Sequence, residues 1–416
     1  MKYANSLKYM NSFIPARNEA DISRKRVTDL CLSLGRINIG TRFICLPGGA
    51  AGHGTAILLE RIIAVSGYNV GRITSCESFD SRLSVYVNGK TPEIEDYNKA
   101  VAELKSAVLR SGEEYNRQEA TFVLSLLLCR LCDCDYVILE GLSNVNYSLD
   151  AVCSPYDLII MPAVYGDNDP TEELKPLCEA IRRGVREVIS GNQKSEVYNI
   201  ISNACAMSGV RLYIPVKSQF VVNEMSLRKI CFGYGGREGY SMKSPSCILR
   251  DCAMIAIEAS LAIRRSGVKM PWNAIVSGLA NVSGMSSFEV ISASPMIITD
   301  SSSNKCEAEL LVKTLNELSI DVSSLSLCVK CRDTENLSDL LSAFSGVSVS
   351  RLAVLVDGVG IDELKVDTAN VTVCKNCEEI ASEAIEMSKV GDLVLCIGSV
   401  SFADSVKNEI LRHMMY

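Results

Sequence analysis

The chain has 416 residues, of which 48% are hydrophobic and 22% are charged, and this balance is typical of a globular protein. No run of residues approaches the roughly 18 uncharged apolar positions that a membrane span requires. The formal net charge of -7 argues against broad nucleic-acid binding, which depends on cationic contacts to phosphates. The N-terminus shows no apolar stretch followed by a cleavage site, so we expect a cytoplasmic protein with no membrane or nucleic-acid partner.

The first part of the chain predicts strands that alternate with helices. Amphipathic helices are expected at about 3–14 and 22–34, followed by an apolar strand at 42–46, a glycine-rich turn at 47–55 and a helical pattern over 56–63. Further strands are expected at 69–73, 136–140 and 157–161, helices at 93–110 and 117–132, and a turn at Asn88-Gly89. This order predicts an α/β fold with a mainly parallel sheet covered on both faces.

The alternation restarts near residue 284. Strands are expected at 296–299, 325–329, 352–356 and 393–396, with helices from 305 and from 376 and a final helix at the end. A single core stops growing at roughly 250 to 300 residues, so a chain of this length predicts two domains. We expect a larger domain at residues 1–283 and a smaller α/β domain at 284–416, joined by a Ser/Gly-rich hinge at 281–287.

The glycine-rich turn is the first candidate for chemistry. A turn between a strand and a helix presents main-chain N–H groups and the positive helix end to an anion, and can therefore hold a phosphate. The turn contains Gly49, Gly52, His53, Gly54 and Thr55, and its spacing differs from the standard P-loop, which ends in Gly-Lys-Ser/Thr. Because glycines also suit a tight structural turn, the residues alone leave both interpretations open.

The segment from Phe43 to Gly89 resembles the folylpolyglutamate and dihydrofolate synthase family of the Mur ligase superfamily. That family carries Gly-Thr-Asn-Gly-Lys-Gly-Ser/Thr, Gly-Tyr-x-Val-Gly, Thr-Ser-Pro-His and Val-Asn-Gly in this order, and the counterparts here are 49–55, 67–71, 74–77 and 87–89. The similarity continues through Glu140, 149–151, 278–280, 288–290, Asp300, Asn304 and 398–399, which is nearly the whole chain. It implies a P-loop-type domain followed by a Rossmann-like domain.

The resemblance implies a ligase that transfers the ATP γ-phosphate to a carboxylate, after which an amine attacks the acyl phosphate to form an amide. Implied ATP-binding residues are Gly49, Gly52, His53, Gly54 and Thr55, with Asp300 and Asn304 from the second domain. Implied Mg²⁺ ligands are Thr55, Ser75 and Glu140, and the implied catalytic residues are His53 and Glu140. The partners would be a nucleotide and a small carboxylic acid, such as a folate. Without the resemblance, Ser75 also reads as a helix cap and Glu140 as a paired or solvated glutamate.

Five sites depart from the family pattern. The loop lysine, which brings a permanent positive charge to the transferred phosphates, is His53, and a histidine is largely neutral near pH 7. The segment expected to supply a metal-binding histidine is 163–169, where only Asp167 or Asp169 could substitute. The lysine that becomes carbamylated is Arg182, which stays protonated. Pro-Gly-Arg-Phe is replaced by 285–288, and Asp-Gly-Ala-His-Asn-Pro by 300–305.

These departures leave more than one function open. The first is a divergent ATP-dependent carboxylate-amine ligase, with either the family substrate or a changed one. The alternative is a non-catalytic protein that keeps the fold as a nucleotide-binding or protein-interaction module.

The 18 cysteines are scattered through predicted strands and helices, and we expect most of them to be buried, reduced thiols. Three Cys-x-x-Cys pairs occur, at Cys129/Cys132, Cys328/Cys331 and Cys374/Cys377. Packing accounts for the first pair. The other two could together form a structural Cys₄ zinc site, although their separation exceeds the roughly 15 to 20 residues of common modules, so zinc is the less favoured interpretation.

Overall fold

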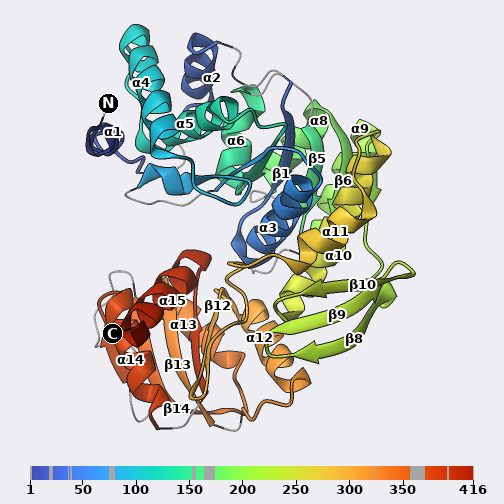
Figure 1. The fold of residues 1–416 in the computed structure, drawn as a ribbon, viewed down its shortest axis with the longest axis vertical. Coiled ribbons are helices and arrows are strands. Elements are labelled where there is room, and N and C mark those ends of the chain that lie inside the picture. The colour runs from blue at the N-terminus through green and yellow to red at the C-terminus, as the bar shows by residue number, and fades with distance from the viewer. Residues whose placement is uncertain are drawn as a thin grey trace.

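The structure, a computed structural model, describes residues 2–17, 22–35, 37, 40–74, 80–151, 156–163, 174–322, 324–356, 371–390 and 393–415. Figure 1 shows two α/β domains, one drawn from blue to yellow and one in orange and red. The predicted α/β class, with a mainly parallel sheet and a second α/β domain, is confirmed. In the described part of the chain, no helix is both long and apolar enough to cross a membrane.

A seven-stranded sheet forms the centre of the first domain, in the order β3-β2-β4-β1-β5-β6-β7. Its strands are β1 (Arg42–Leu46), β2 (Val70–Ile73), β3 (Val85–Val87), β4 (Tyr136–Glu140), β5 (Tyr156–Met161), β6 (Val185–Ser190) and β7 (Arg211–Tyr213). All neighbours pair in parallel except β2 and β3. After β3, Asn88 (φ 50°) and Gly89 (φ 78°) make the predicted turn, because both adopt the left-handed backbone that such a turn needs.

Helices cover both faces of this sheet, because the side chains of each strand alternate between two cores. Along β1, Phe43 and Cys45 belong to one core, while Ile44 and Leu46 belong to the other. The first face carries α1 (Tyr3–Met10), α2 (Arg24–Ser33), α4 (Ile94–Ser111), α5 (Arg117–Leu131), α6 (Leu142–Ala151), α8 (Lys175–Arg183) and α9 (Ser195–Ser208). The second carries α3 (Gly49–Val65), α10 (Cys247–Arg265) and α11 (Trp272–Ala280).

A small antiparallel sheet, which the sequence analysis did not predict, extends from the same domain. It consists of β8 (Phe220–Ser226), β9 (Lys229–Tyr234) and β10 (Arg237–Met242), in the order β10-β9-β8. The rings of Phe220, Phe232 and Tyr240 stack along one side of it, and Tyr240 meets Trp272 of α11 edge-on. These aromatic contacts attach the small sheet to the core that contains α3 and α10.

The second domain contains a six-stranded sheet in the order β11-β12-β16-β13-β14-β15, parallel except for the edge pair β11 and β12. Its strands are β11 (Glu289–Ala293), β12 (Met296–Asp300), β13 (Ser324–Cys331), β14 (Ser348–Val356), β15 (Val371–Cys374) and β16 (Leu393–Ile397). Its helices are α12 (Lys305–Glu317), α13 (Thr334–Ser342), α14 (Cys377–Ser388) and α15 (Val400–Met415). The predicted hinge lies between α11 and β11.

The glycine-rich segment differs from its prediction. We expected a turn up to Thr55 and a helix after it, but α3 begins at Gly49, directly after Gly48. Gly49 has φ 78°, a backbone conformation that glycine adopts without strain, and it lets the chain turn at once into the helix. The absence of a side chain at Gly52 then lets the helix pack on the preceding turn, since a Cβ there would lie 2.0 Å from the Pro47 carbonyl oxygen.

Candidate active site between the two domains

The residues predicted to hold phosphate lie in the first turns of α3. In an α-helix, each N–H after the first turn donates to the carbonyl four residues earlier. The amides of Gly52, His53, Gly54 and Thr55 therefore donate within the helix. Only the amides of the first turn, which begins at Gly49, are not used by hydrogen bonds of the helix. The Thr55 side chain is also used internally, because its Oγ1 donates a 2.8 Å hydrogen bond to the Ala51 carbonyl.

The back of this turn is closed by α10. A Cβ at Gly54 would lie 2.7 Å from Leu249 Cδ2 and 3.3 Å from Cys252 Sγ. The Cys252 thiol donates to the Ala51 carbonyl at 3.3 Å. Gly54 thus allows α3 and α10 to pack closely. This is a structural role, whereas the family motif predicts that Gly54 binds phosphate.

A buried ion-pair network lies beside the turn and connects α3 to β2 and β4. His53 Nδ1 is 2.9 Å from Glu140 Oε1, and Arg72 Nη1 donates to Glu140 Oε2 at 2.7 Å. Arg72 Nε also donates to Glu60 Oε2 at 2.7 Å. The side chains of Glu60, Arg72 and Glu140 are each less than a tenth exposed, at 3%, 5% and 9%. One guanidinium therefore bridges two buried carboxylates, an arrangement that its planar fork of donors favours.

Further contacts complete this network. The second oxygen of Glu60, Oε1, accepts a 2.6 Å hydrogen bond from the Gly89 N–H in the turn after β3. The Tyr86 ring lies 4.6 Å from the Arg72 guanidinium, within the range of a cation–π contact. Burial alone would raise the pKa of Glu140, but the charges and hydrogen bonds of His53 and Arg72 outweigh it and lower that pKa to about 2. Glu140 is therefore a carboxylate at neutral pH.

The implied Mg²⁺ ligands do not fit a metal site of the family type. Ser75 lies outside the described residues, as do the alternative ligands Asp167 and Asp169. Thr55 is fully buried and donates its hydroxyl to a carbonyl, and both oxygens of Glu140 already contact cationic or donor groups. A hard divalent cation needs oxygen ligands with open lone pairs and a low local positive charge. Arg72 instead places a positive charge beside Glu140 and occupies one of its oxygens.

The two residues predicted from the second domain also have internal partners. Asp300, at the end of β12, accepts hydrogen bonds from the Phe288 N–H (2.7 Å), the Ser302 N–H (2.9 Å) and Ser287 Oγ (3.1 Å), and from Ser302 Oγ. Burial raises the pKa of Asp300, while these hydrogen bonds lower it in part. Asn304 is the N-cap of α12, where its side chain accepts from the Glu307 N–H at 3.0 Å. Both side chains therefore organise the start of the second domain.

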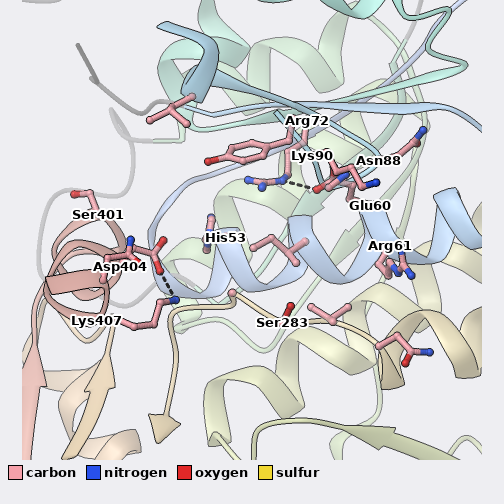
Figure 2. Close-up of a pocket in the computed structure, with 18 of the residues that line it drawn as sticks. His53, Glu60, Arg61, Arg72, Asn88, Lys90, Ser283, Ser401, Asp404 and Lys407 are labelled. Carbon is pink, nitrogen blue, oxygen red and sulfur yellow. Dashed lines mark hydrogen bonds and ion pairs between the residues drawn. The ribbon is translucent and has the colours of Figure 1, made fainter. Parts of the chain in front are cut away.

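A pocket of about 930 Å³ opens between the two domains, along the side of α3 (Figure 2). One wall comes from α3, β2 and residues 83–90, and the other from residues 281–284 and from α15. His53 lines this pocket, and its Nδ1 contacts Glu140. The pocket thus runs along the flank of α3, whereas the predicted phosphate site is at its N-terminal end.

The pocket is lined by more cationic than acidic side chains. Its cationic lining residues are Arg61, Arg72, Lys90 and Lys407, and its acidic ones are Glu60 and Asp404. Arg72 is neutralised by Glu60 and Glu140. Lys407 pairs with Asp404 at 2.9 Å, as Figure 2 shows, and also with Glu289. Among the described residues, Arg61 and Lys90 are exposed and form no ion pair. Arg61 and Lys90, whose charges are not used in ion pairs of the described residues, make the pocket suited to an acidic ligand.

Arg72 and Glu60 were not singled out from the sequence. The signal was a charged residue in the middle of each of two apolar elements, since an arginine or glutamate is seldom fully buried unless it is paired. The residues of these ion pairs are 12 and 68 positions apart in the sequence, so the sequence alone does not predict the pairs. Arg182, predicted at the carbamylated-lysine position, lies in the last turn of α8 and donates to the Cys178 carbonyl at 3.2 Å.

The cysteine pairs lie in cores rather than in a ligand cluster. Cys328 is fully buried on β13 and donates to Met387 Sδ at 3.9 Å. Cys129 packs against β2, where a Cβ at Gly71 would lie 2.4 Å from its Sγ. Within the part of the chain that the structure describes, no three or more His, Cys, Asp or Glu side chains are placed to hold a metal ion. A zinc site therefore gains no support here.

Comparison with known proteins gives matches in structure but not in sequence. No family model and no curated protein matches the chain. The folylpolyglutamate synthetase of Lactobacillus casei is 17% identical, with a TM-score of 0.75, and the match covers 99% of this chain and all of that one. A folylpolyglutamate synthase complex with AMPPCP and folate has a TM-score of 0.79 at 17% identity and the same coverage. The Mycobacterium tuberculosis enzyme, complexed with ADP and AMPPCP, is 14% identical, with a TM-score of 0.76 over 98% of this chain and 99% of that one.

Nearly the whole chain therefore has the fold of these folylpolyglutamate synthases, and the predicted resemblance is confirmed at the level of the fold. The low sequence identity agrees with a divergent chain. At this identity the similarity shows the fold alone.

Proposed function

We propose that this protein is a non-catalytic relative of the folylpolyglutamate synthases, which uses the pocket between its domains to bind a small acidic molecule. The observation that carries the proposal is the state of Glu140, whose two carboxylate oxygens contact Arg72 and His53. The residue that the family pattern assigns to Mg²⁺ thus has an internal cation as its partner.

Two further observations support a loss of catalysis. Phosphoryl transfer depends on a fixed positive charge and on amides that surround the transferred phosphate. Here His53 replaces the loop lysine, and the amides from Gly52 to Thr55 belong to α3. The second-domain residues Asp300 and Asn304 are bonded within their own domain.

The pocket and the structures of similar fold both favour a small acidic molecule as the ligand. Arg61 and Lys90 line the pocket and form no ion pair among the described residues, and the pocket volume of about 930 Å³ lies within the range of small-molecule sites. Structures of similar fold contain AMPPCP, ADP and folate, all of which are acidic. Nucleotides and folates are therefore the first ligands to test.

The test of catalysis is an ADP-release assay with ATP, Mg²⁺, glutamate and reduced folates. The Lactobacillus casei enzyme serves as the positive control, and Glu140→Gln as the background. We expect no ADP formation above that background, from either the wild type or His53→Lys, because the lysine alone does not reopen the first turns of α3. Turnover by the wild type that Glu140→Gln abolishes would favour the alternative, an active ATP-dependent carboxylate-amine ligase.

Binding is tested separately by thermal shift and calorimetry with ATP, ADP and folates, each with and without Mg²⁺. A ligand that binds the folded protein raises its melting temperature by mass action. We expect stabilisation by an acidic ligand that weakens when Arg61 and Lys90 are both changed to Ala. Equal stabilisation of the wild type and this double variant would show that the ligand binds outside the pocket.

A further inference from the structure

We propose that Cys129 and Cys134 form a modification site, at which hydrogen peroxide converts the two thiols reversibly into an intramolecular disulfide. Both residues belong to the core on the sheet face that α3 does not cover. The inference therefore goes beyond the proposed function and does not depend on which ligand the pocket binds.

The backbone at the end of α5 brings the two cysteines together. The helix ends at Leu131, and the chain reverses at Asp133, which has a left-handed backbone with φ 49°. The Asp133 N–H donates to the Arg130 carbonyl at 3.0 Å, and the Cys134 N–H donates to the Cys129 carbonyl at 3.0 Å. These two bonds make a Schellman motif, in which the side chains at the positions of Cys129 and Cys134 commonly contact each other.

Gly71 on the neighbouring strand β2 leaves the space in which the sulfurs meet. A Cβ at Gly71 would lie 2.4 Å from Cys129 Sγ and 3.3 Å from Cys134 Sγ, so both sulfurs occupy the space above this one residue. Two residues whose main chains share a hydrogen bond have their Cα atoms within the roughly 4.4 to 6.8 Å that a disulfide spans. The sulfurs can therefore bond without a rearrangement of the helix end.

The two thiols differ in access and in acidity. Cys134 is 6% exposed and Cys129 is 3% exposed, while Cys132 in the same turn is partly exposed. The Cys134 thiol and burial both raise the pKa of Cys129, which is therefore protonated at neutral pH. Because the thiolate is the nucleophile, the first reaction with an oxidant falls to the more accessible Cys134.

The oxidation then takes two steps. Cys134 Sγ attacks one peroxide oxygen, so that an S–O bond forms, the O–O bond breaks and one water leaves, which gives a sulfenic acid. Cys129 Sγ attacks the Cys134 sulfur next. The S–S bond forms, the S–O bond breaks, and the hydroxyl leaves as a second water with the proton of the Cys129 thiol. Two thiols are oxidised and one peroxide is reduced to two waters.

The chain offers a matched control pair in the second domain. Cys328 and Cys396 are partners in the register of β13 and β16, and their thiols also interact. Both are 0% exposed in the core of that domain. We expect this pair to stay reduced under conditions that oxidise Cys129 and Cys134, because no oxidant reaches it.

The experiment treats the folded, full-length wild type with hydrogen peroxide, blocks the remaining thiols with N-ethylmaleimide in denaturant, and maps the tryptic peptides by mass spectrometry. Trypsin cleaves after Arg130, so a bond from Cys129 to Cys134 joins two peptides. We expect these joined peptides, with fragmentation placing the bond on Cys134, and their separation by dithiothreitol. The variant Cys132→Ser should give the same bond.

Three results would overturn the inference. One is a wild type in which the peroxide oxidises Cys231, a partly exposed thiol of β9, while Cys129 and Cys134 still react with N-ethylmaleimide. Another is a cross-link that fragmentation places on Cys132. The third is oxidation of the control pair without oxidation of Cys129 and Cys134. All three are measured on the wild type, so they decide the question even if Cys132→Ser fails to fold.

Discussion

Arg72 and Glu140 lie on neighbouring parallel strands, β2 and β4, and their side chains meet on the sheet face that α3 covers. The pairing of Arg72 with Ile138 places Glu140 two residues further along the same face. The resulting 2.7 Å contact is buried and couples both strands to α3 through Glu60 and His53. The stability of the first domain should therefore depend on the ionisation of Glu140.

We predict that acid weakens the fold through this carboxylate. The pKa of Glu140 is about 2 in the folded protein against an ordinary 4.5, so the unfolded chain binds the proton more tightly. The stabilisation is present above pH 4.5 and is lost as the pH falls through 2. A shift of this size corresponds to about 3 kcal/mol. Glu140→Gln should lose about that much at pH 7, measured by urea unfolding from pH 2 to 8.

The control for this prediction is Glu103→Gln. Glu103 pairs with Arg130, but its side chain is 42% exposed, so its removal should cost less than about 1 kcal/mol. If Glu140→Gln and Glu103→Gln lost the same small amount, the buried network would not contribute as described.

A second prediction concerns the closed turn at the start of α3. Gly52→Ala would bring a Cβ to 2.0 Å from the Pro47 carbonyl oxygen, a backbone atom that cannot move away cheaply. At Gly54 the nearest atom is the end of the Leu249 side chain, which can adjust. Alanine gains roughly 0.5 to 1 kcal/mol of helix propensity at either site. We expect Gly52→Ala to lose about 2 kcal/mol or more and Gly54→Ala clearly less.

Thermal and urea unfolding of the two glycine variants provides the measurement. The reverse order of stability would mean that the turn before α3 is open, and that Gly52 keeps the freedom expected of a phosphate loop. Tight ATP binding by the wild type together with that reverse order would restore the ligase interpretation.

The sequence predicted the central strands and the fold class well, because their apolar runs are bounded by turn residues. The start of α3 was predicted incorrectly, since glycines at 48, 49, 52 and 54 look like a loop locally, while contacts with Pro47 and α10 close them into a helix. The small sheet β8–β10 was missed because exposed β8 residues such as Val221 and Val222 do not follow an inward-outward alternation.

In the site, the sequence identified His53 and Glu140 but not the pairing that defines them. Glu140 was assigned to a metal by resemblance, and nothing local to it indicates that Arg72, 68 positions away, contacts it. Similarly, Asp300 and Asn304 keep their positions in the pattern, while their hydrogen bonds serve the hinge and the start of α12. The spacing of the motifs therefore predicts where the candidate site lies, while the ion pairs and hydrogen bonds within it depend on tertiary contacts.

A third prediction uses the opposite pKa shift at Glu307. This carboxylate is buried at the start of α12 and accepts hydrogen bonds from the Ser303 N–H (2.8 Å) and hydroxyl (3.0 Å). Burial raises its pKa to about 7, against an ordinary 4.5. Between these values the folded state binds more protons than the unfolded chain, so stability is full below pH 4.5 and falls as the pH rises through 7.

Glu307→Gln should remove that dependence. Its unfolding free energy should equal that of the wild type near pH 4 and exceed it by up to about 3 kcal/mol at pH 8, since the neutral amide pays no charge-burial penalty. Glu309→Gln, at an exposed position of the same helix, is the control and should leave the pH profile unchanged. A constant difference between Glu307→Gln and the wild type from pH 4 to 8 would contradict the shift.

The last prediction concerns the connection between the domains through Asp300. Its carboxylate holds Ser287 and the Phe288 N–H, and Ser287 in turn contacts Ser246 at 2.8 Å, next to the start of α10 in the first domain. In Asp300→Asn one oxygen becomes an NH₂ group that faces donors, so at least one buried hydrogen bond is lost, at about 1 to 3 kcal/mol each. We expect lower stability and faster proteolysis within 281–287. Asp333→Asn, at the exposed N-cap of α13, should have no such effect because asparagine caps equally well. Unchanged cleavage of Asp300→Asn would show that this carboxylate does not hold the hinge.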